Sequence, residues 1–126
     1  MMAGQSLKGI QRLKAAFFNS MEGLKAAWKN EEAFRQESVL MVLAFPLGLW
    51  LGEGAVEQIL LIGSVMLIVI VELLNSAIES TVDRIGLERH ELSGRAKDVA
   101  SAAILVTSSL AGLVWILIAY EHYPIF

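Results

Sequence analysis

An amphipathic segment followed by three apolar runs makes up the hydrophobic pattern of the chain. Over residues 8–35, apolar side chains recur at spacings of three and four, which predicts a helix with one apolar face. These side chains are Ile10, Leu13, Phe17, Met21, Leu24 and Trp28. A basic amphipathic helix beside a membrane span is typical of a helix lying in the headgroup region; the alternative is a soluble helix that packs on a neighbour. We expect it to bend or break at Gly23 and Asn30.

Each of the three apolar runs approaches the roughly 20 residues with which a helix crosses a bilayer. We predict spans at about residues 33–52, 55–83 and 97–120, preceded by the amphipathic helix at residues 8–32. Gly52, Glu53 and Gly54 predict a tight turn, and we expect a loop over residues 84–98. The predicted fold class is therefore an all-α membrane protein, one domain over residues 1–126, with a surface helix and three transmembrane helices.

The composition excludes several classes of protein. The chain has 126 residues, of which 56% are hydrophobic, and a mean hydropathy of +0.59, which is too apolar for a small soluble protein. It contains no cysteine, so disulfides, thiolate catalysis and iron–sulfur clusters are excluded. His90 and His122 are too few for a histidine metal cluster. The net charge of −3 argues against nucleic acid as a partner.

Basic residues predict the orientation in the membrane. All ten Lys and Arg residues lie before the first span or between the second and third. They are Lys8, Arg12, Lys14, Lys25, Lys29 and Arg35, and then Arg84, Arg89, Arg95 and Lys97. Because cytoplasmic loops carry the excess of Lys and Arg, the N-terminus is predicted inside and the C-terminus outside.

The second apolar run carries a polar stripe, formed by Glu72, Asn75, Glu79 and Asp83. At about 100° per residue these side chains fall within a sector of roughly 80° on a helix. A carboxylate in hydrocarbon costs at least about 2.5 kcal/mol, so such residues usually face a partner or a wet cavity and mark function. The alternatives are a structural seam between helices and the solvated face of a soluble core helix.

The residues around the stripe suit phosphoryl transfer, which needs positioning, cations on the phosphates and a base for the attacking hydroxyl. Glu31 and Glu79 offer the oxygen ligands that Mg²⁺ prefers. Arg12 and Lys97 could neutralise phosphate, and a desolvated Glu72 could accept a hydroxyl proton.

The residues alone leave the function open. Lys97 and Asp98 could simply be charges at the start of a helix. The chain contains no GxxxxGK[ST], so a kinase of this sequence would belong to none of the usual soluble classes. A lipid-directed enzyme, a proton- or cation-coupled transporter that uses Glu72 and a structural membrane subunit are all compatible with the pattern.

Three long segments resemble a known family: AAWKNEEAFRQE (26–37), VELLNSAIESTVDRIG (71–86) and HELSGRAKDVASAA (90–103). Over nearly its full length the chain is similar to the prokaryotic integral-membrane diacylglycerol kinases. The resemblance implies transfer of the ATP γ-phosphate to 1,2-diacylglycerol, with Mg²⁺, to give phosphatidic acid at the cytoplasmic face of the bacterial inner membrane. It also implies a homotrimer with active sites shared between subunits. A related branch phosphorylates undecaprenol, which is the alternative substrate.

The resemblance also implies roles for single residues. Glu72 would be the catalytic proton acceptor, supported by Asn75, and Glu31 and Glu79 would be the magnesium ligands. The ATP contacts would be Arg12, Glu31, Glu79, Glu88, His90, Lys97 and Asp98. The lipid substrate would contact Arg12, Ala33, Phe34, Arg35, Gln36, Glu37, Glu72 and Ser101.

Three spans cannot fully surround the polar stripe of the second one. Helices from other copies would shield it from lipid, which gives oligomerisation a physical motive. We therefore predict that the second span lines the centre of a homotrimeric bundle.

Overall fold

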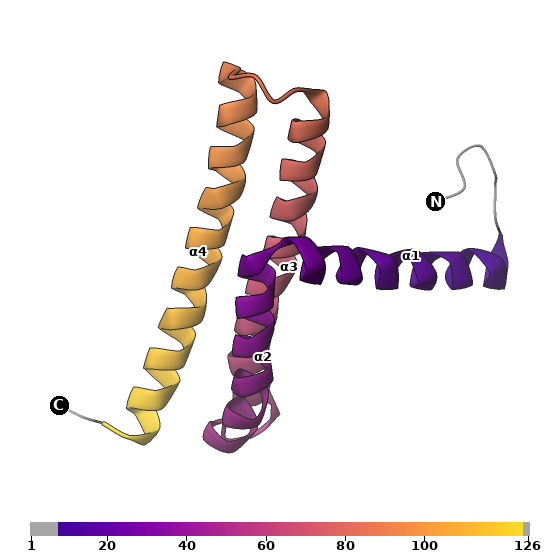
Figure 1. Cartoon of the computed structure of the whole chain (residues 1–126). Coiled ribbons are helices and arrows are strands. Elements are labelled where there is room, and N and C mark those ends of the chain that lie inside the picture. Colours follow the sequence, from indigo (N-terminus) through magenta and orange to yellow (C-terminus); the bar gives the residue numbers. More distant parts are fainter. Residues whose placement is uncertain (1–7, 125–126) are drawn as a thin grey trace.

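The computed structural model describes residues 8–124, and these fold into four helices (Figure 1). They are α1 (Gly9–Asn30), α2 (Glu32–Leu51), α3 (Ala55–Ile85) and α4 (Glu91–His122). α3 packs against both α2 and α4, and is the central helix of the bundle. α1 meets the others at the start of α2 and extends away from the bundle, roughly across its axis. The prediction of an all-helical chain is confirmed for the described residues.

The corner between α1 and α2 is formed by Glu31, whose backbone is extended (φ −118°, ψ 107°). Arg35 Nη1 donates hydrogen bonds to the carbonyl oxygens of Trp28 (2.6 Å) and Lys29 (3.3 Å). These are among the last carbonyls of α1, which have no partner within the helix. The predicted break beside Asn30 is therefore confirmed. The predicted break at Gly23 is wrong, since α1 runs through it without interruption.

α2 and α3 form a tight hairpin whose turn, residues 52–54, is the predicted one. Gly54 has φ +88°, a left-handed conformation that favours glycine. Further along the hairpin, the backbone of α2 lies directly against α3 at Gly48. A Cβ atom there would lie 2.8 Å from Ile62 Cγ1 and 3.3 Å from Leu61 Cβ. The absence of a side chain at Gly48 therefore sets the distance between α2 and α3.

We expect Gly48→Ala to destabilise the protein by about 1–3 kcal/mol, because the added methyl group overpacks a helix contact that cannot relax freely. Thermal unfolding in detergent micelles measures this as a lower midpoint. The matched control is Gly63→Ala on α3, where an added Cβ meets no atom within 4 Å. Equal destabilisation by both changes would contradict the packing explanation.

The connection between α3 and α4 is shorter than the predicted loop over residues 84–98. α3 continues to Ile85 and α4 begins at Glu91. His90 caps the new helix, since its Nδ1 accepts a hydrogen bond from the backbone N–H of Leu92 (3.1 Å). Glu91 in the first turn suits the helix dipole and pairs with Arg95 (3.2 Å). The charged ELSGRAKD segment is therefore helical, because capping compensates for its polarity.

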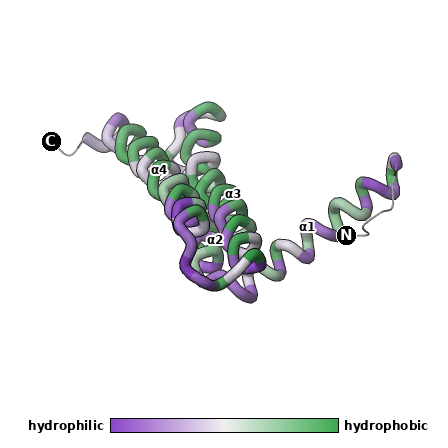
Figure 2. The backbone as a smooth tube through the Cα atoms, turned by 90° about the horizontal axis from the view of Figure 1, so that it is seen from above, coloured by the Kyte–Doolittle hydropathy of each residue, from purple (hydrophilic) through white to green (hydrophobic). Residues whose placement is uncertain are grey.

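Hydrophobic and hydrophilic residues alternate along α1, whereas α2, α3 and α4 consist mostly of hydrophobic residues (Figure 2). Among them Val42 is 71% exposed and Leu105 and Val106 are each 69% exposed. By length and composition, α3 and α4 could each cross a membrane. α2 does not meet the same criteria, and its first two turns carry three charged side chains.

Candidate functional site

The polar stripe on α3 grades from buried to exposed toward the end of the helix. Glu72 is 3% exposed and Asn75 is 6% exposed, whereas Glu79 is half-buried and Asp83 is exposed. A carboxylate as buried as Glu72 is rare without a partner or a function. The α3 helix thus presents one acid in a covered position and further acids closer to solvent.

Two carboxylates of this stripe have two further carboxylates near them, which come from the start of α2 and the corner before it. We call these four the acidic cluster: Glu31, Glu37, Glu72 and Glu79. The charges of Glu79 and Glu31 both act on the Glu72 carboxyl group, and Glu72 in turn acts on Glu37. The corner before α2 is what brings Glu31 to α3. Four like charges repel one another, so this arrangement favours the binding of a cation or a proton.

Asn75 connects the members of the stripe. Its Nδ2 donates a hydrogen bond to Glu79 Oε1 (3.1 Å), which fixes the orientation of that carboxylate. Among residues 8–124, no partner is found for the buried Asn75 Oδ1 or for the neighbouring buried Ser76 Oγ. Buried polar atoms are nearly always hydrogen-bonded, so these two oxygens are acceptors that a polar ligand or a water molecule can satisfy.

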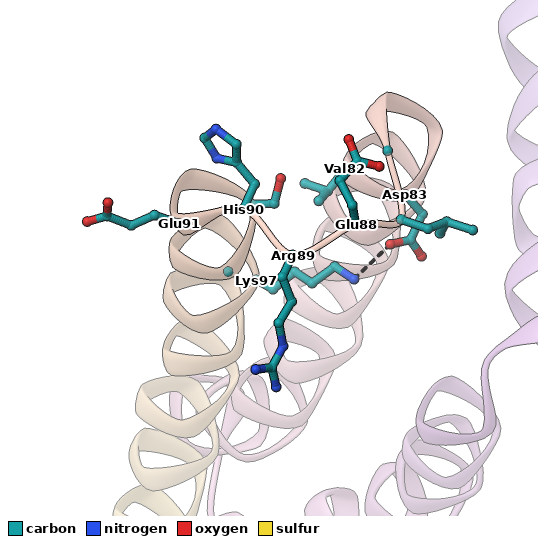
Figure 3. Close-up of a pocket in the computed structure, with 11 residues that line it drawn as sticks. Val82, Asp83, Glu88, Arg89, His90, Glu91 and Lys97 are labelled. Carbon is teal, nitrogen blue, oxygen red and sulfur yellow. Dashed lines mark hydrogen bonds and ion pairs between the residues drawn. The ribbon is translucent and has the colours of Figure 1, made fainter.

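A pocket of about 450 Å³ lies where α3 passes into α4 (Figure 3). Lys97 crosses from α4 to α3 and its Nζ lies 2.7 Å from Asp83 Oδ1. The pocket is also lined by Glu88, Arg89 and His90. The charge of Glu79 acts on Lys97 as well, so the pocket and the acidic cluster influence each other electrostatically.

Two grooves adjoin the acidic cluster. One, of about 520 Å³, lies between α1 and α3 and is lined by polar and small residues that include Asn30, Glu31 and Ser76. The other, of about 510 Å³, lies over α3 between α2 and α4. Its lining is mostly aliphatic, with Glu37 as its one carboxylate. A groove lined largely by small residues and a mostly aliphatic groove therefore meet the same group of acids.

The structure brings together most of the predicted site residues. Glu31, Glu72, Asn75 and Glu79 form the acidic cluster and its support, and Glu88, His90 and Lys97 line the α3–α4 pocket. Asp98 and Ser101 are exposed on α4. Arg12 is also exposed, in the first turns of α1, at the end that extends away from the bundle (Figure 1). The single chain therefore does not bring Arg12 to Glu72.

The segment predicted to contact lipid has mixed roles. Phe34 is buried and Ala33 is exposed. Arg35 binds carbonyls at the α1–α2 corner, and Gln36 Nε2 donates to Glu32 Oε1 (3.4 Å). Of this segment, Glu37 lines the apolar groove.

Sequence reasoning missed three residues of the site: Ser76, Asp83 as the partner of Lys97, and Arg89. Asp83 had a signal, because it continues the polar stripe. Its pairing with Lys97 depends on how α4 returns along α3, which no local pattern specifies. The orphaned Ser76 hydroxyl becomes visible only when burial is known.

Comparison with known proteins identifies the family of the chain. The model of the prokaryotic diacylglycerol kinase family matches residues 18–119. The chain belongs to this family. The diacylglycerol kinase of Escherichia coli K12 is 52% identical over 115 residues, covering 91% of this chain and 94% of the relative. That of Haemophilus influenzae is 55% identical over 107 residues, covering 85% and 91%.

The match also covers more distant members of the family. The diacylglycerol kinase of Pseudomonas aeruginosa is 45% identical over 107 residues, covering 85% of this chain and 87% of the relative. The matched residues include the acidic cluster, the polar stripe and the α3–α4 pocket. Membership of the diacylglycerol kinase family, together with the apolar helices α3 and α4, indicates a membrane protein.

Proposed function

We propose that this protein is an ATP-dependent diacylglycerol kinase, a phosphotransferase that moves the γ-phosphate of ATP to the hydroxyl of 1,2-diacylglycerol and yields phosphatidic acid. The observation that carries the proposal is the buried Glu72, surrounded by Glu31 and Glu79 and connected through Glu79 to Lys97. Family membership supports the same activity.

Helix lengths support a position for Glu72 near the cytoplasmic boundary of the membrane. α2 has 20 residues and is about 30 Å long, which matches the hydrocarbon core. α3 and α4 have 31 and 32 residues, about 46 and 48 Å, and extend well beyond the level of α1 (Figure 1). Glu72 lies about 25 Å along α3, just inside this boundary, whereas the pocket around Lys97 lies in water.

This position suits a reaction between a lipid and a soluble nucleotide. Glu72 accepts the proton of the lipid hydroxyl as that oxygen forms a bond to the γ-phosphorus, while the bond from this phosphorus to the bridging β-phosphate oxygen breaks and ADP leaves. Lys97, held by Asp83, neutralises phosphate charge, and Glu88, His90 and Asp98 contribute to the nucleotide site. Arg12 acts on phosphate from another subunit, because its own helix α1 carries it away from Glu72.

The residues present fit Mg²⁺. Glu31 and Glu79 would hold the ion, and the orphaned Asn75 Oδ1 is a further oxygen of the type that Mg²⁺ binds. Among the described residues, Glu31, Glu72 and Glu79 do not come within 4.8 Å of one another as a three-carboxylate group. One or two carboxylates with phosphate oxygens is the usual magnesium environment. When bound, the ion would offset the negative charge of the phosphates.

The apolar groove beside Glu37 is suited to acyl chains. It opens along α2 and α4 and reaches the acidic cluster, so a lipid lying in it would present its headgroup to Glu72. Of the predicted lipid contacts, Glu37 lines this groove.

The decisive test is ATP-dependent phosphorylation of lipid in detergent micelles. We expect radiolabelled phosphatidic acid from 1,2-diacylglycerol, dependent on Mg²⁺, and little product from undecaprenol. Higher turnover of undecaprenol would favour the alternative substrate. Proton flux through sealed liposomes without any lipid product would instead favour a transporter.

We propose a homotrimer with active sites shared between subunits and with α3 at its centre. The exposed apolar surface and the distance of Arg12 from Glu72 support it. Co-expression of Arg12→Ala and Glu72→Gln chains tests it, because a mixed trimer contains sites that take an intact Arg12 from one chain and an intact Glu72 from another. We expect each variant to be inactive alone and partial activity in the mixture. No recovery in mixed trimers would contradict sharing.

We propose that the N-terminus lies in the cytoplasm, with α2, α3 and α4 all crossing the inner membrane. The chain contains no cysteine, so single introduced cysteines report on accessibility without background. In intact spheroplasts, a membrane-impermeant maleimide should label Ala55→Cys at the start of α3 and leave Lys25→Cys on α1 unlabelled. The reverse pattern would contradict the orientation.

Asn75→Ala should weaken the apparent affinity for Mg²⁺ by about 10–100-fold, since Asn75 orients the Glu79 carboxylate. The measurement is the dependence of lipid phosphorylation on free Mg²⁺ at saturating ATP. Thr81→Ala, which removes an exposed hydroxyl almost two turns further along α3, is the control and should leave this dependence unchanged. An unchanged magnesium dependence in Asn75→Ala would show that the hydrogen bond does not position a ligand.

A further inference from the structure

At the end of the bundle opposite the acidic cluster, two helices and a turn bring carboxylates around one imidazole. His122 ends α4, Glu57 lies in the first turn of α3, and Glu53 lies in the turn that precedes α3. His122 Nε2 lies 2.7 Å from Glu57 Oε1, and His122 Nδ1 lies 3.3 Å from Glu53 Oε1. The His122 side chain is 13% exposed. None of these residues belongs to the kinase site described above.

The ligand geometry of this end suits a metal ion. A nitrogen of His122 and one carboxylate oxygen each from Glu57 and Glu121 all lie within 4.8 Å of one another. Imidazole nitrogen and carboxylate oxygen are both ligand atoms that zinc accepts, and three protein ligands leave a fourth tetrahedral position for water. The Glu53 carboxylate then contacts the other ring nitrogen. A carboxylate in this position is a usual outer-shell partner of a metal-bound histidine.

The charge balance around these residues also favours a cation. The sequence has no Lys or Arg between Arg35 and Arg84, and none after Lys97. Three carboxylates therefore face one another at this end with a single imidazole between them, and even a protonated His122 leaves an excess of negative charge.

The site is also held together by packing beyond the carboxylates. Trp50 at the end of α2 stacks on Tyr123, with ring centroids 6.0 Å apart and planes at 10°. This contact holds the end of α4 against the hairpin of α2 and α3, so the ligands do not have to be gathered when an ion binds.

We propose that Glu57, Glu121 and His122 bind a divalent transition-metal cation, with zinc as the best match, and that Glu53 orients the histidine from the outer shell. The ion would join α3 and α4 at the end of the bundle farthest from the phosphoryl-transfer site. An imidazole ligand selects zinc over the magnesium that the acidic cluster suits.

The test is calorimetric titration of Zn²⁺ into the metal-stripped full-length protein in detergent micelles, with excess Mg²⁺ to occupy hard-oxygen sites. We expect one zinc equivalent per chain that is lost in His122→Gln and weakened at least tenfold in Glu121→Gln. Glu53→Gln should lose about 10–100-fold in affinity. Glu121 is exposed, so we expect Glu121→Gln to keep the fold even if His122→Gln does not. Unchanged Mg·ATP-dependent lipid phosphorylation by Glu121→Gln would show that its fold is intact.

Co²⁺ provides a spectroscopic check of the ligand set. The wild-type protein should develop visible absorption bands with Co²⁺, and these should be absent in His122→Gln and retained in His90→Gln, which changes the histidine at the other end of the bundle. Binding should also weaken as the pH falls, because the proton competes for the imidazole. Two results would overturn the proposal: a heat of zinc titration no larger than that of micelles alone, or zinc binding that persists in both His122→Gln and Glu121→Gln. His122 and its carboxylates would then form only an ion pair.

Discussion

Glu72→Gln should lower the rate of diacylglycerol phosphorylation by about 10²–10⁴-fold, the usual contribution of a positioned general base. Glutamine has nearly the same shape, and Glu72 is almost fully buried, so the change removes the proton acceptor without opening a cavity. Removing one charge from four crowded carboxylates should leave the fold intact or slightly more stable. We therefore expect the loss in kcat, with the KM for ATP close to that of the wild type.

The matched control for this variant is Glu22→Gln on α1. Glu22 is exposed and its ion pair with Lys25 (3.5 Å) is of the surface kind, which contributes little to stability. Full activity in the control, together with the same oligomeric state in both variants, assigns the loss to chemistry at Glu72. A Glu72→Gln protein that phosphorylates lipid at the wild-type rate would eliminate Glu72 as the base.

Glu79→Gln should lower turnover by about 10²-fold or more at a magnesium concentration that saturates the wild type. Glu79 is held by Asn75 and its charge reaches both Glu72 and Lys97, so it stands between the lipid side and the nucleotide side of the site. Loss of a carboxylate ligand weakens the electrostatic stabilisation that a metal provides, which is worth several kcal/mol in a transition state. We expect the deficit to shrink as magnesium is raised.

The magnesium titration distinguishes a ligand from a structural residue. Partial rescue of Glu79→Gln by high magnesium, and by Mn²⁺, supports metal binding, whereas Glu72→Gln should gain nothing from either ion. Glu32→Gln on α2 serves as a control, because Glu32 is an exposed carboxylate beside the corner and outside the acidic cluster. If Glu79→Gln showed the wild-type magnesium dependence, Glu79 would not be a ligand.

The polar stripe illustrates how far the sequence alone could lead. The spacing of Glu72, Asn75 and Glu79 places them on one helix face at 3.6 residues per turn, and the structure has them there. The break beside Asn30 and the turn at residues 52–54 could also be predicted from the sequence, because both depend on the residues at that point of the chain. The loop between α3 and α4 was predicted too long, because hydropathy alone does not reveal that His90 caps a helix through a polar segment.

The sequence by itself determined that the chain is helical, too apolar for a small soluble protein, and equipped with a line of acids on one helix, because these properties depend on composition and on a period along a single element. The tertiary structure decided which acids meet. Glu31 reaches Glu72 because the chain turns a corner before α2, Lys97 reaches Asp83 because α4 runs back along α3, and His122 reaches Glu57 for the same reason at the other end. Such contacts join residues far apart in the chain, and they depend on the packing of whole helices, which no local pattern encodes.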